Sequence, residues 1–333
     1  MAVTWTNKHN LPEVFVNAIT NDNHVVNGDI SVTQLIDAPQ IRQLKRLTNY
    51  ELDVTDMIGM MLGTAMHEHL ERLSFSSNYR TRILKEASGI LRSNQPKVSD
   101  WLDKYIEESF ETDKRHTLEM NLTMEINGWT LSGTFDIYDK LKKELDDWKV
   151  TSASMVMFPE FIQSRKTQLN IYKVMAEHNG LEVDSAKIRS VIKDWSKMKI
   201  LSNKDYPKIP YDELDVPLLE EEVVMKYLRK RVDLHQRAEN GESIPCTPKD
   251  RWAKADTYAV KKKGLKKAKR VFDNKAMAEK FMNENNFKFD KELYVEFRPS
   301  ESFRCKNGYC PVSEVCPQYQ KEKELSAEKA QDI

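Results

Sequence analysis

The sequence lacks several features that would assign it to a class of protein at once. It has only four cysteines and ten glycines in 333 residues, and its 52 basic residues balance its 52 acidic residues. A net charge of zero predicts no polyanionic partner from the chain as a whole, so any attraction for a polyanion must come from local patches. Hydrophobic residues make up 40% of the chain, which argues against disorder.

Long apolar runs are also missing. The most apolar stretch, Met57–Met66, is far shorter than the roughly 20 residues that a membrane-spanning helix needs. The N-terminus has no basic region followed by an apolar core, which is the pattern of a secretory signal. We therefore expect no membrane partner and a cytoplasmic protein. In that compartment thiols stay reduced, and clustered cysteines indicate a metal site rather than disulfides.

The spacing of the apolar residues predicts an α/β fold. Helical periodicity predicts helices over residues 31–47, 56–73, 159–178, 218–240 and 274–285. Alternation or β-branched residues predict strands over 118–126, 129–138, 145–151, 187–195, 257–261 and 293–298. Asn127-Gly128, between the first two strands, is a strong hairpin signal. Residues 203–217 contain three prolines and are predicted as a loop.

The sequence is predicted to form three parts. Residues 1–240 are expected to form a core domain that includes N-terminal helices. Residues 241–320 are expected to form a cysteine-rich module with a basic run, and residues 321–333 a polar tail. No internal repeat occurs.

Acidic and basic side chains gather on neighbouring predicted strands. Asp136 lies on the polar face of one strand, and Asp147 and Lys149 share one face of the next. Two nearby carboxylates repel each other unless a cation lies between them, and hard oxygen ligands suit Mg²⁺ or Mn²⁺. The lysine places a positive charge where a phosphate and an attacking water would meet. Such a short pattern usually marks a solvent-facing strand, so its context decides the interpretation.

Four motifs in order resemble the PD-(D/E)XK nuclease superfamily, in particular its RecB-like exonuclease branch. They lie within residues 63–172 and read Gly63-Thr-Ala-Met-His67-Glu-His-Leu-Glu71, Gly133-Thr-Phe-Asp136, Asp147-Trp-Lys149 and Gln168-Leu-Asn-Ile-Tyr172. The resemblance implies an α/β, restriction-endonuclease-like fold with a mixed central sheet flanked by helices. It also implies a small cysteine-stapled C-terminal α+β module.

The resemblance further implies the metal ligands. Asp136 and Asp147 would bind the metal through carboxylates, His67 through a ring nitrogen, and Trp148 through its main-chain carbonyl. The triplet His67-Glu-His69 would also suit zinc, but residues two apart on a helix point in different directions. We therefore predict that His67 is the ligand and that His69 takes no part.

Lys149, Gln168 and Tyr172 receive roles in the same way, and the position of Glu71, four residues after His67, suggests a further one. Lys149 would orient the attacking water and stabilise the phosphate in the transition state. Gln168 and Tyr172, four residues apart on one helical face, would hold the DNA backbone or brace Lys149. Glu71 would hydrogen-bond the ring of His67.

The four cysteines predict a second metal site. Cys305, Cys310 and Cys316 lie within twelve residues of one another, and Cys246 lies upstream. Four thiolates can hold zinc or an iron–sulfur cluster. Several RecB-like nucleases carry a 4Fe-4S cluster on three C-terminal cysteines and a distant one, and the last gap here resembles theirs. The first gap is longer, and Cys246 follows the core instead of preceding it, so Zn²⁺ stays open as the alternative to 4Fe-4S.

A basic run follows in the same module, with seven cations between Lys261 and Arg270. It is either a solvated face or a local focus for phosphates with salt-sensitive binding. Trp252 and Tyr258 lie nearby and would either pack in a core or stack on bases.

Together these features predict a Mg²⁺- or Mn²⁺-dependent DNA nuclease. The resemblance favours an exonuclease over an endonuclease, acting on duplex ends or single strands in DNA recombination, repair or replication. It implies a product with a 5′-phosphate, a phage-encoded origin, and a recombination or replication protein as partner. Two alternatives remain open, namely a non-catalytic DNA-binding subunit and a zinc-stapled protein-interaction module.

Overall fold

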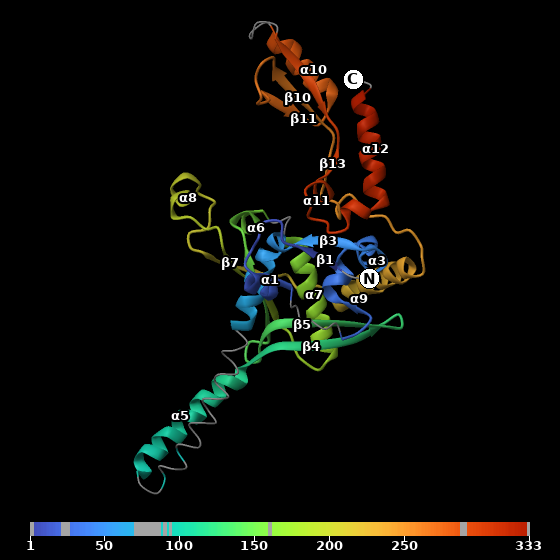
Figure 1. Ribbon diagram of the computed structural model, residues 1–333. Helices are drawn as coiled ribbons and strands as arrows, with labels where there is room; N and C mark the ends of the chain where they lie inside the picture. The colour runs from blue at the N-terminus through green and yellow to red at the C-terminus, as the bar shows by residue number, and fades with distance from the viewer. Residues whose placement is uncertain are drawn as a thin grey trace. The chain divides into compact units, whose positions relative to one another are not determined.

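A computed structural model of the chain, shown in Figure 1, describes residues 3–20, 27–69, 88, 92, 95–158, 162–286 and 292–331. It divides into two compact units. Unit 1 comprises Met1–Thr4, Asp37–Leu52 and Arg237–Ile333, and unit 2 comprises Trp5–Ile36 and Asp53–Gln236. Unit 1 thus contains a segment, Asp37–Leu52, that lies within the predicted domain 1–240.

Unit 2 is built on a six-stranded mixed sheet. The strand order is β2–β5–β6–β7–β8, and β4 also pairs with β5. The pairs β2–β5 and β6–β7 are parallel, whereas β4–β5, β5–β6 and β7–β8 are antiparallel. The strands are β2 (Ile30–Ser31), β4 (His116–Ile126), β5 (Trp129–Asp139), β6 (Glu144–Thr151), β7 (Ser185–Ile192) and β8 (Tyr211–Asp215).

Helices flank this sheet, so the predicted mixed α/β arrangement is confirmed. The helix α7 contacts β4, β5, β6 and β7, and α2 contacts both α7 and β5. Their apolar side chains form one buried core that includes Leu35, Leu122, Leu131, Leu145 and Leu169. The helices are α1 (Glu13–Thr20), α2 (Val32–Ile36), residues 58–69, α5 (Pro96–Arg115), α6 (Ala153–Met157), α7 (Gln163–His178), α8 (Lys197–Ser202) and α9 (Glu221–Glu239), with a 3-10 turn η1 (Val54–Met57).

The hairpin between β4 and β5 forms as predicted. Asn127 and Gly128 have φ angles of 49° and 77°, the left-handed values that a two-residue type I′ turn requires. Ile126 pairs with Trp129 directly across this turn. The turn therefore fixes the register of the whole hairpin, including the strand that carries Asp136.

Three sequence predictions need correction. The helix predicted over residues 31–47 is two helices, α2 and α3 (Pro39–Leu47), because Ala38 before the proline is extended at φ −62° and ψ 133°. The loop predicted over residues 203–217 contains β8, a charged edge strand flanked by Pro210 and Pro217. The predicted polar tail is helical as far as Gln331, in α12 (Pro317–Gln331).

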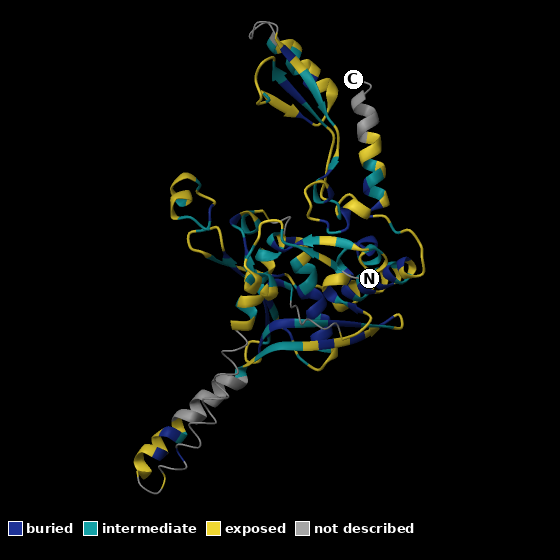
Figure 2. Ribbon diagram, viewed as in Figure 1, coloured by how far each residue is buried: buried dark blue, intermediate teal, exposed yellow. Residues whose placement is uncertain are grey.

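Unit 1 contains a small three-stranded antiparallel sheet, in the order β11–β10–β12, with α10 packed against it. Figure 2 shows much of α10 and β11 in yellow, the colour of exposed residues. Its elements are α3, β9 (Ala253–Lys254), β10 (Thr257–Lys262), β11 (Arg270–Phe272), α10 (Lys275–Asn286), β12 (Leu293–Arg298), β13 (Glu301–Ser302), α11 (Phe303–Lys306), η3 (Ser313–Val315) and α12. The strands β1 (Val3–Thr6) and β3 (Tyr50–Asp53) begin in unit 1 and end in unit 2. No described helix combines the length and the apolar character needed to cross a bilayer.

Candidate active site

The predicted site lies where β5 and β6 separate. The two strands pair only over Ile137–Asp139 and Glu144–Asp146, so Asp136 and Asp147 occupy the first position beyond the paired stretch. There the Asp136 Oδ2 atom accepts a hydrogen bond of 2.6 Å from the main-chain N–H of Trp148. A carboxylate thus takes the place of a backbone carbonyl at the point of separation.

Lys149 connects the two predicted carboxylate ligands. Its Nζ donates to Asp147 Oδ1 at 2.7 Å and lies 3.7 Å from Asp136 Oδ2. The side chain of Asp147 is only 2% exposed, and its Oδ2 atom makes no hydrogen bond within the described part of the chain. A buried carboxylate oxygen without a partner is costly. Asp147 therefore offers one oxygen to a further cation.

His67 reaches the same place from the helix over residues 58–69. Its Nδ1 lies 3.3 Å from Glu119 Oε1 and 3.6 Å from Asp136 Oδ1. The neighbouring His69 is exposed, as expected for a residue two positions further along a helix. Glu71 lies outside the described residues.

Glu119 is a member of the site that the sequence analysis missed. One ligand atom each from His67, Glu119 and Asp136 lie within 4.8 Å of one another, the one such group found among the described residues. Glu119 has a φ of 48° and lies between the rungs Leu118–Ile137 and Met120–Phe135, opposite Asp136. The Asn127-Gly128 turn sets this register, so counting outward from the turn would have identified Glu119.

Burial and charge shift the titration of this group. Burial raises the pKa of Asp136 to about 6, assisted by the charge of Asp147 and opposed by Lys149 and His67. A hydrogen bond with Glu119 raises the pKa of His67. Burial opposes a positive charge on Lys149, but the two aspartates outweigh it and raise its pKa. The site therefore holds carboxylates at close quarters and a lysine that stays protonated.

The helix α7 supplies a second layer beneath the site. Gln168 Nε2 donates to Tyr172 Oη at 3.1 Å, so the predicted pair is engaged with itself. Tyr172 packs against Gly133, where an added Cβ would lie 2.6 Å from Tyr172 Cε1 and 2.8 Å from Val32 Cγ2. A cavity of about 200 Å³ opens beside this contact and is lined by Ser31, Val32, Thr33, Glu119, Asn121, Ser132, Gly133, Thr134, Asp136 and Tyr172.

Arg165 is a second residue that the sequence analysis missed. It lies on α7 one turn before Gln168, and its guanidinium donates to Thr151 Oγ1 at 3.2 Å. Burial lowers its pKa, and the charge of Asp147 counteracts this effect. The sequence could have pointed to Arg165, because it lies three residues before Gln168 and residues three apart on a helix share a face.

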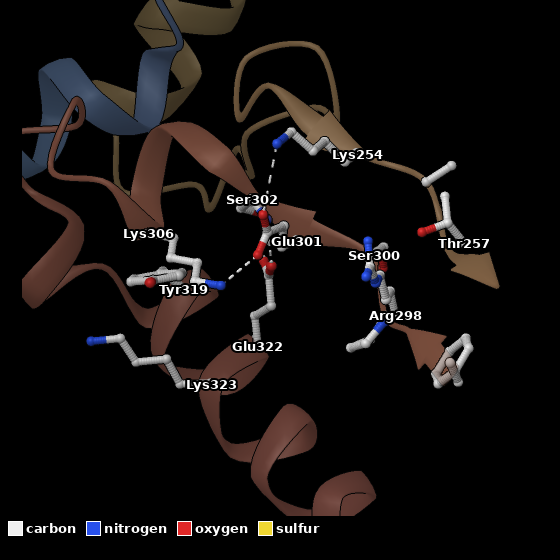
Figure 3. Close-up of a pocket in the computed structure, with 13 residues that line it drawn as sticks. Lys254, Thr257, Arg298, Ser300, Glu301, Ser302, Lys306, Tyr319, Glu322 and Lys323 are labelled. Atoms are coloured by element: carbon white, nitrogen blue, oxygen red, sulfur yellow. Dashed lines mark hydrogen bonds and ion pairs between the residues drawn. The ribbon is translucent and has the colours of Figure 1, made fainter. Parts of the chain in front are cut away.

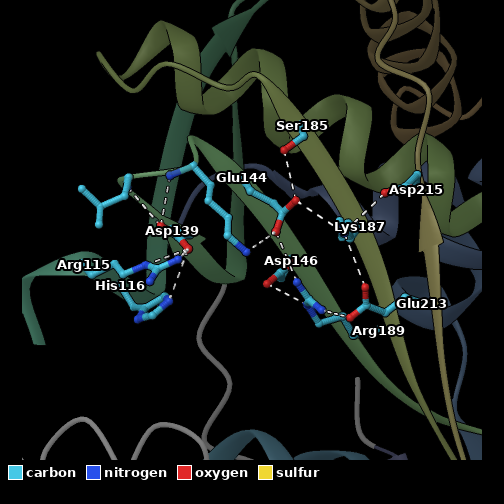
Figure 4. A network of polar contacts seen from close by, with 12 residues as sticks. Arg115, His116, Asp139, Glu144, Asp146, Ser185, Lys187, Arg189, Glu213 and Asp215 are labelled. Carbon is cyan, nitrogen blue, oxygen red and sulfur yellow. Dashed lines mark hydrogen bonds and ion pairs between the residues drawn. The ribbon is translucent and has the colours of Figure 1, made fainter. Parts of the chain in front are cut away.

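The other side of β6 carries a separate polar network, drawn in Figure 4. Arg189 contacts Asp146 at 2.8 Å and Glu144 at 3.2 Å, and Lys187 lies 3.9 Å from Glu144. Asp146 Oδ1 also lacks a hydrogen-bond partner within the described residues, but no histidine or further carboxylate there joins it in a metal-sized group. This network ties β6, β7 and β8 together with paired charges.

The four cysteines come together in unit 1. All four are free and buried, and together they line a cavity of about 10 Å³. A hydrogen bond from Cys305 lowers the pKa of Cys310, and burial raises the pKa of Cys246 to about 12. Gln40 Nε2 lies 3.7 Å from Cys316 Sγ and donates to it. Among the described residues, which include all four cysteines, no three sulfurs lie within 4.8 Å of one another.

Comparisons with known proteins assign no family to the chain. No protein-family model matches the sequence, and no curated protein matches it. Among solved structures the chain is similar to the crystal structure of a "Putative exonuclease" from Eubacterium rectale. The identity is 14%, the match covers 52% of this chain and 68% of that chain, and the TM-score is 0.29.

Proposed function

We propose that the chain is a metal-dependent nuclease of the PD-(D/E)XK type, related to the RecB-like branch, that hydrolyses phosphodiester bonds in DNA. We further propose exonuclease action on DNA ends or single strands, in recombination, repair or replication. One observation carries the proposal. Asp136, Asp147 and Lys149 converge with His67 and Glu119 at the point where β5 and β6 separate, although they come from distant parts of the sequence.

The chemistry of the donor set fits a divalent cation. His67, Glu119 and Asp136 offer one nitrogen and two carboxylate ligands within reach of one ion. Asp147 lies outside this group of three, and its unpartnered Oδ2 is proposed as a ligand of the same ion or of a second one. Mg²⁺ or Mn²⁺ bound there would activate a water molecule and neutralise charge on the phosphate. The predicted carbonyl ligand from Trp148 remains part of this proposal. We add Glu119 to the ligands predicted from the sequence.

Lys149 supplies the fixed positive charge of the site. Asp147 holds its ammonium at 2.7 Å, which orients the group and keeps it protonated. A preoriented cation stabilises the negative charge that develops on the phosphate without any rearrangement at the moment of reaction. Arg165 lies close enough for the charge of Asp147 to affect it, and we propose that it supports the same charge.

Tyr172 and Gln168 are proposed to contact the DNA backbone. Tyr172 lines the cavity beside Asp136, and Gln168 fixes the direction of its hydroxyl by donating to it. The hydrogen bond between Gln168 and Tyr172 is compatible with this role and with the alternative of bracing Lys149.

The cysteines are proposed to hold a 4Fe-4S cluster. Four buried sulfurs line one small cavity, and two receive hydrogen bonds, one from Gln40 and one from the main-chain N–H of Val312. Hydrogen bonds to cysteine sulfurs are typical of iron–sulfur sites. Zn²⁺ stays open as the alternative metal at these four cysteines. A bound cluster would close the chain between Cys246 and Cys316 and stabilise unit 1.

Cleavage of end-labelled single- and double-stranded DNA tests the proposed function. The wild-type protein should cleave with Mg²⁺ or Mn²⁺ and stop when EDTA is added, whereas Asp136→Asn should be inactive. Asp184→Asn is the matched control, because Asp184 is 68% exposed on the surface of unit 2. If the wild type binds DNA but cleaves no substrate with either metal, the chain is a DNA-binding subunit and the proposal is wrong.

A further inference from the structure

The small sheet of unit 1 has two different faces. One face packs against α10 through Tyr258, Val260, Phe272 and Leu293. The other face bears the alternate residues of the same strands, among them Lys261, Val271, Tyr294, Glu296 and Arg298 around the buried Ala259. We call it the open face. Tyr258 belongs to the packed face and lies 5.2 Å from Phe297, which assigns it to the core.

An exposed aromatic ring lies on the open face beside a cation. Tyr294 is 41% exposed and pairs in register with Lys261, while Val271 on β11 is 46% exposed. The face also bears one carboxylate, Glu296, which contacts Lys261 and Arg298 at 2.9 Å each. That carboxylate is therefore neutralised within the sheet. A ring that stays exposed next to cations is a surface on which a base can stack.

Most cations of the basic run lie in the loop that joins β10 to β11. The N–H of Lys263 donates to Glu292 O at 2.9 Å, and the N–H of Lys269 donates to Val260 O at 2.8 Å. These bonds anchor the two ends of the loop 263–269 near the pair that Tyr294 forms with Lys261. Lys263, Lys266 and Lys267 are exposed in it. The loop concentrates positive charge in a chain whose net charge is zero.

The strands β10 and β12 end beside a cavity of about 620 Å³ in the same unit, drawn in Figure 3. Thr257 and Arg298 form the last rung of the open face and also line this cavity. Its lining contains four cations, Lys254, Arg298, Lys306 and Lys323, and two carboxylates, Glu301 and Glu322. Lys306 contacts Glu301 at 2.5 Å, and Lys254 lies 3.9 Å from Glu301. Cations outnumber carboxylates along the whole path from the loop to the cavity.

We propose that this path binds a single strand of nucleic acid. Lys263, Lys266 and Lys267 would hold phosphates, one base would stack on Tyr294, and the strand would continue past Arg298 into the cavity. An extended polyanion fits a row of cations on one side of a sheet, and an unpaired base fits an exposed ring, which a duplex would not supply. The proposal rests on the proposed function for the identity of the strand as substrate, but binding itself requires no catalysis.

Binding of a fluorescent oligothymidylate of about 20 nucleotides to the full chain tests it. The measurement is made in EDTA, so cleavage plays no part. Replacing Lys263, Lys266 and Lys267 by Gln should reduce the slope of log K against log salt by about 2 and weaken binding about 50-fold at physiological salt. Tyr294→Ala should weaken binding about tenfold, and Tyr294→Phe should restore it.

A charge-matched control separates this surface from general electrostatics. Gln at Lys275, Lys280 and Lys321 removes the same charge from exposed positions on α10 and α12 and should change binding little. Wild-type binding by both the loop variant and Tyr294→Ala would overturn the proposal, even if the protein still cleaves DNA. If the protein binds phosphatidylserine vesicles through the loop lysines but does not bind the oligonucleotide, the surface is a membrane-binding one. That result would also overturn the proposal.

Discussion

Replacing Gly133 by Ala tests how the floor of the site is built. The new methyl group would lie 2.6 Å from Tyr172 Cε1 and 2.8 Å from Val32 Cγ2, closer than carbon atoms approach in proteins. Neither neighbour can move easily, because Tyr172 is 5% exposed, Val32 is 1% exposed, and the tyrosine hydroxyl is held by Gln168. The substitution must therefore strain the contact or displace Tyr172.

Overpacking of this kind costs about 1–3 kcal/mol of unfolding free energy. For a domain of this size, a loss of 2 kcal/mol lowers Tm by roughly 4–8 °C, which thermal denaturation followed by circular dichroism would detect. Displacement of Tyr172 by about 1 Å should also reduce cleavage by roughly 100-fold. In a double-mutant cycle, Tyr172→Ala should relieve part of the cost of Gly133→Ala, since it removes one of the two clashing neighbours.

Gly63→Ala is the matched control. Among the described residues, and leaving out the helix's own backbone and the two chain neighbours, no atom lies within 4 Å of a Cβ added at Gly63, in the helix over residues 58–69. This change should therefore leave stability unchanged or raise it by about 0.5–1 kcal/mol. A Gly133→Ala protein as stable as the wild type would refute the reasoning. So would a cycle in which the two substitutions at Gly133 and Tyr172 are additive.

Three further predictions concern the proposed ligand Glu119, the ion pair of Arg115 with Asp139, and the four cysteines. Glu119→Gln should weaken Mn²⁺ binding at least tenfold in calorimetry, whereas His69→Ala should leave it unchanged; equal affinities would remove Glu119 from the ligands. Arg115 lowers the pKa of Asp139 to about 2, so the pair stabilises the fold above pH 4 and loses this effect as the pH falls toward 2. Asp139→Asn should therefore cost about 2 kcal/mol at neutral pH and remove that acid dependence from urea unfolding; an unchanged pH profile would contradict this. Anaerobically purified protein should contain about four iron atoms per chain by elemental analysis, and Cys310→Ser should lose them; zinc in their place would identify the alternative metal.

The sequence predicted the parts of the fold that depend on local patterns. Alternation located β4, β5 and β6, and the Asn127-Gly128 turn set the register between the first two. Residues 31–47 are largely helical, as their periodicity predicted, but Pro39 divides the predicted helix in two. The segment after the break belongs to unit 1. Periodicity does not report such a break, whereas the proline and the residue before it do.

The site was harder to predict, because it depends on contacts between distant segments. The structure brings His67, Asp136, Asp147 and Lys149 together, and the chemical roles assigned to them remain proposals. Glu119 was missed since it is one polar residue among several on an alternating strand, and only the hairpin register places it opposite Asp136. The exposure of Tyr294 on the open face also depends on which side of its sheet α10 covers, a choice that the sequence alone did not make.

The single-turnover rate of DNA cleavage with Mg²⁺ tests the central claim most directly. Lys149→Ala should reduce the rate about 100- to 1,000-fold, because the fixed charge beside the phosphate is lost. Lys142→Ala, which removes a lysine that is 56% exposed on the turn before β6, should cleave at the wild-type rate. Calorimetry should show that Lys149→Ala still binds Mn²⁺ and therefore remains folded. Cleavage by Lys149→Ala at the wild-type rate would contradict the proposal that this cluster is the hydrolytic centre.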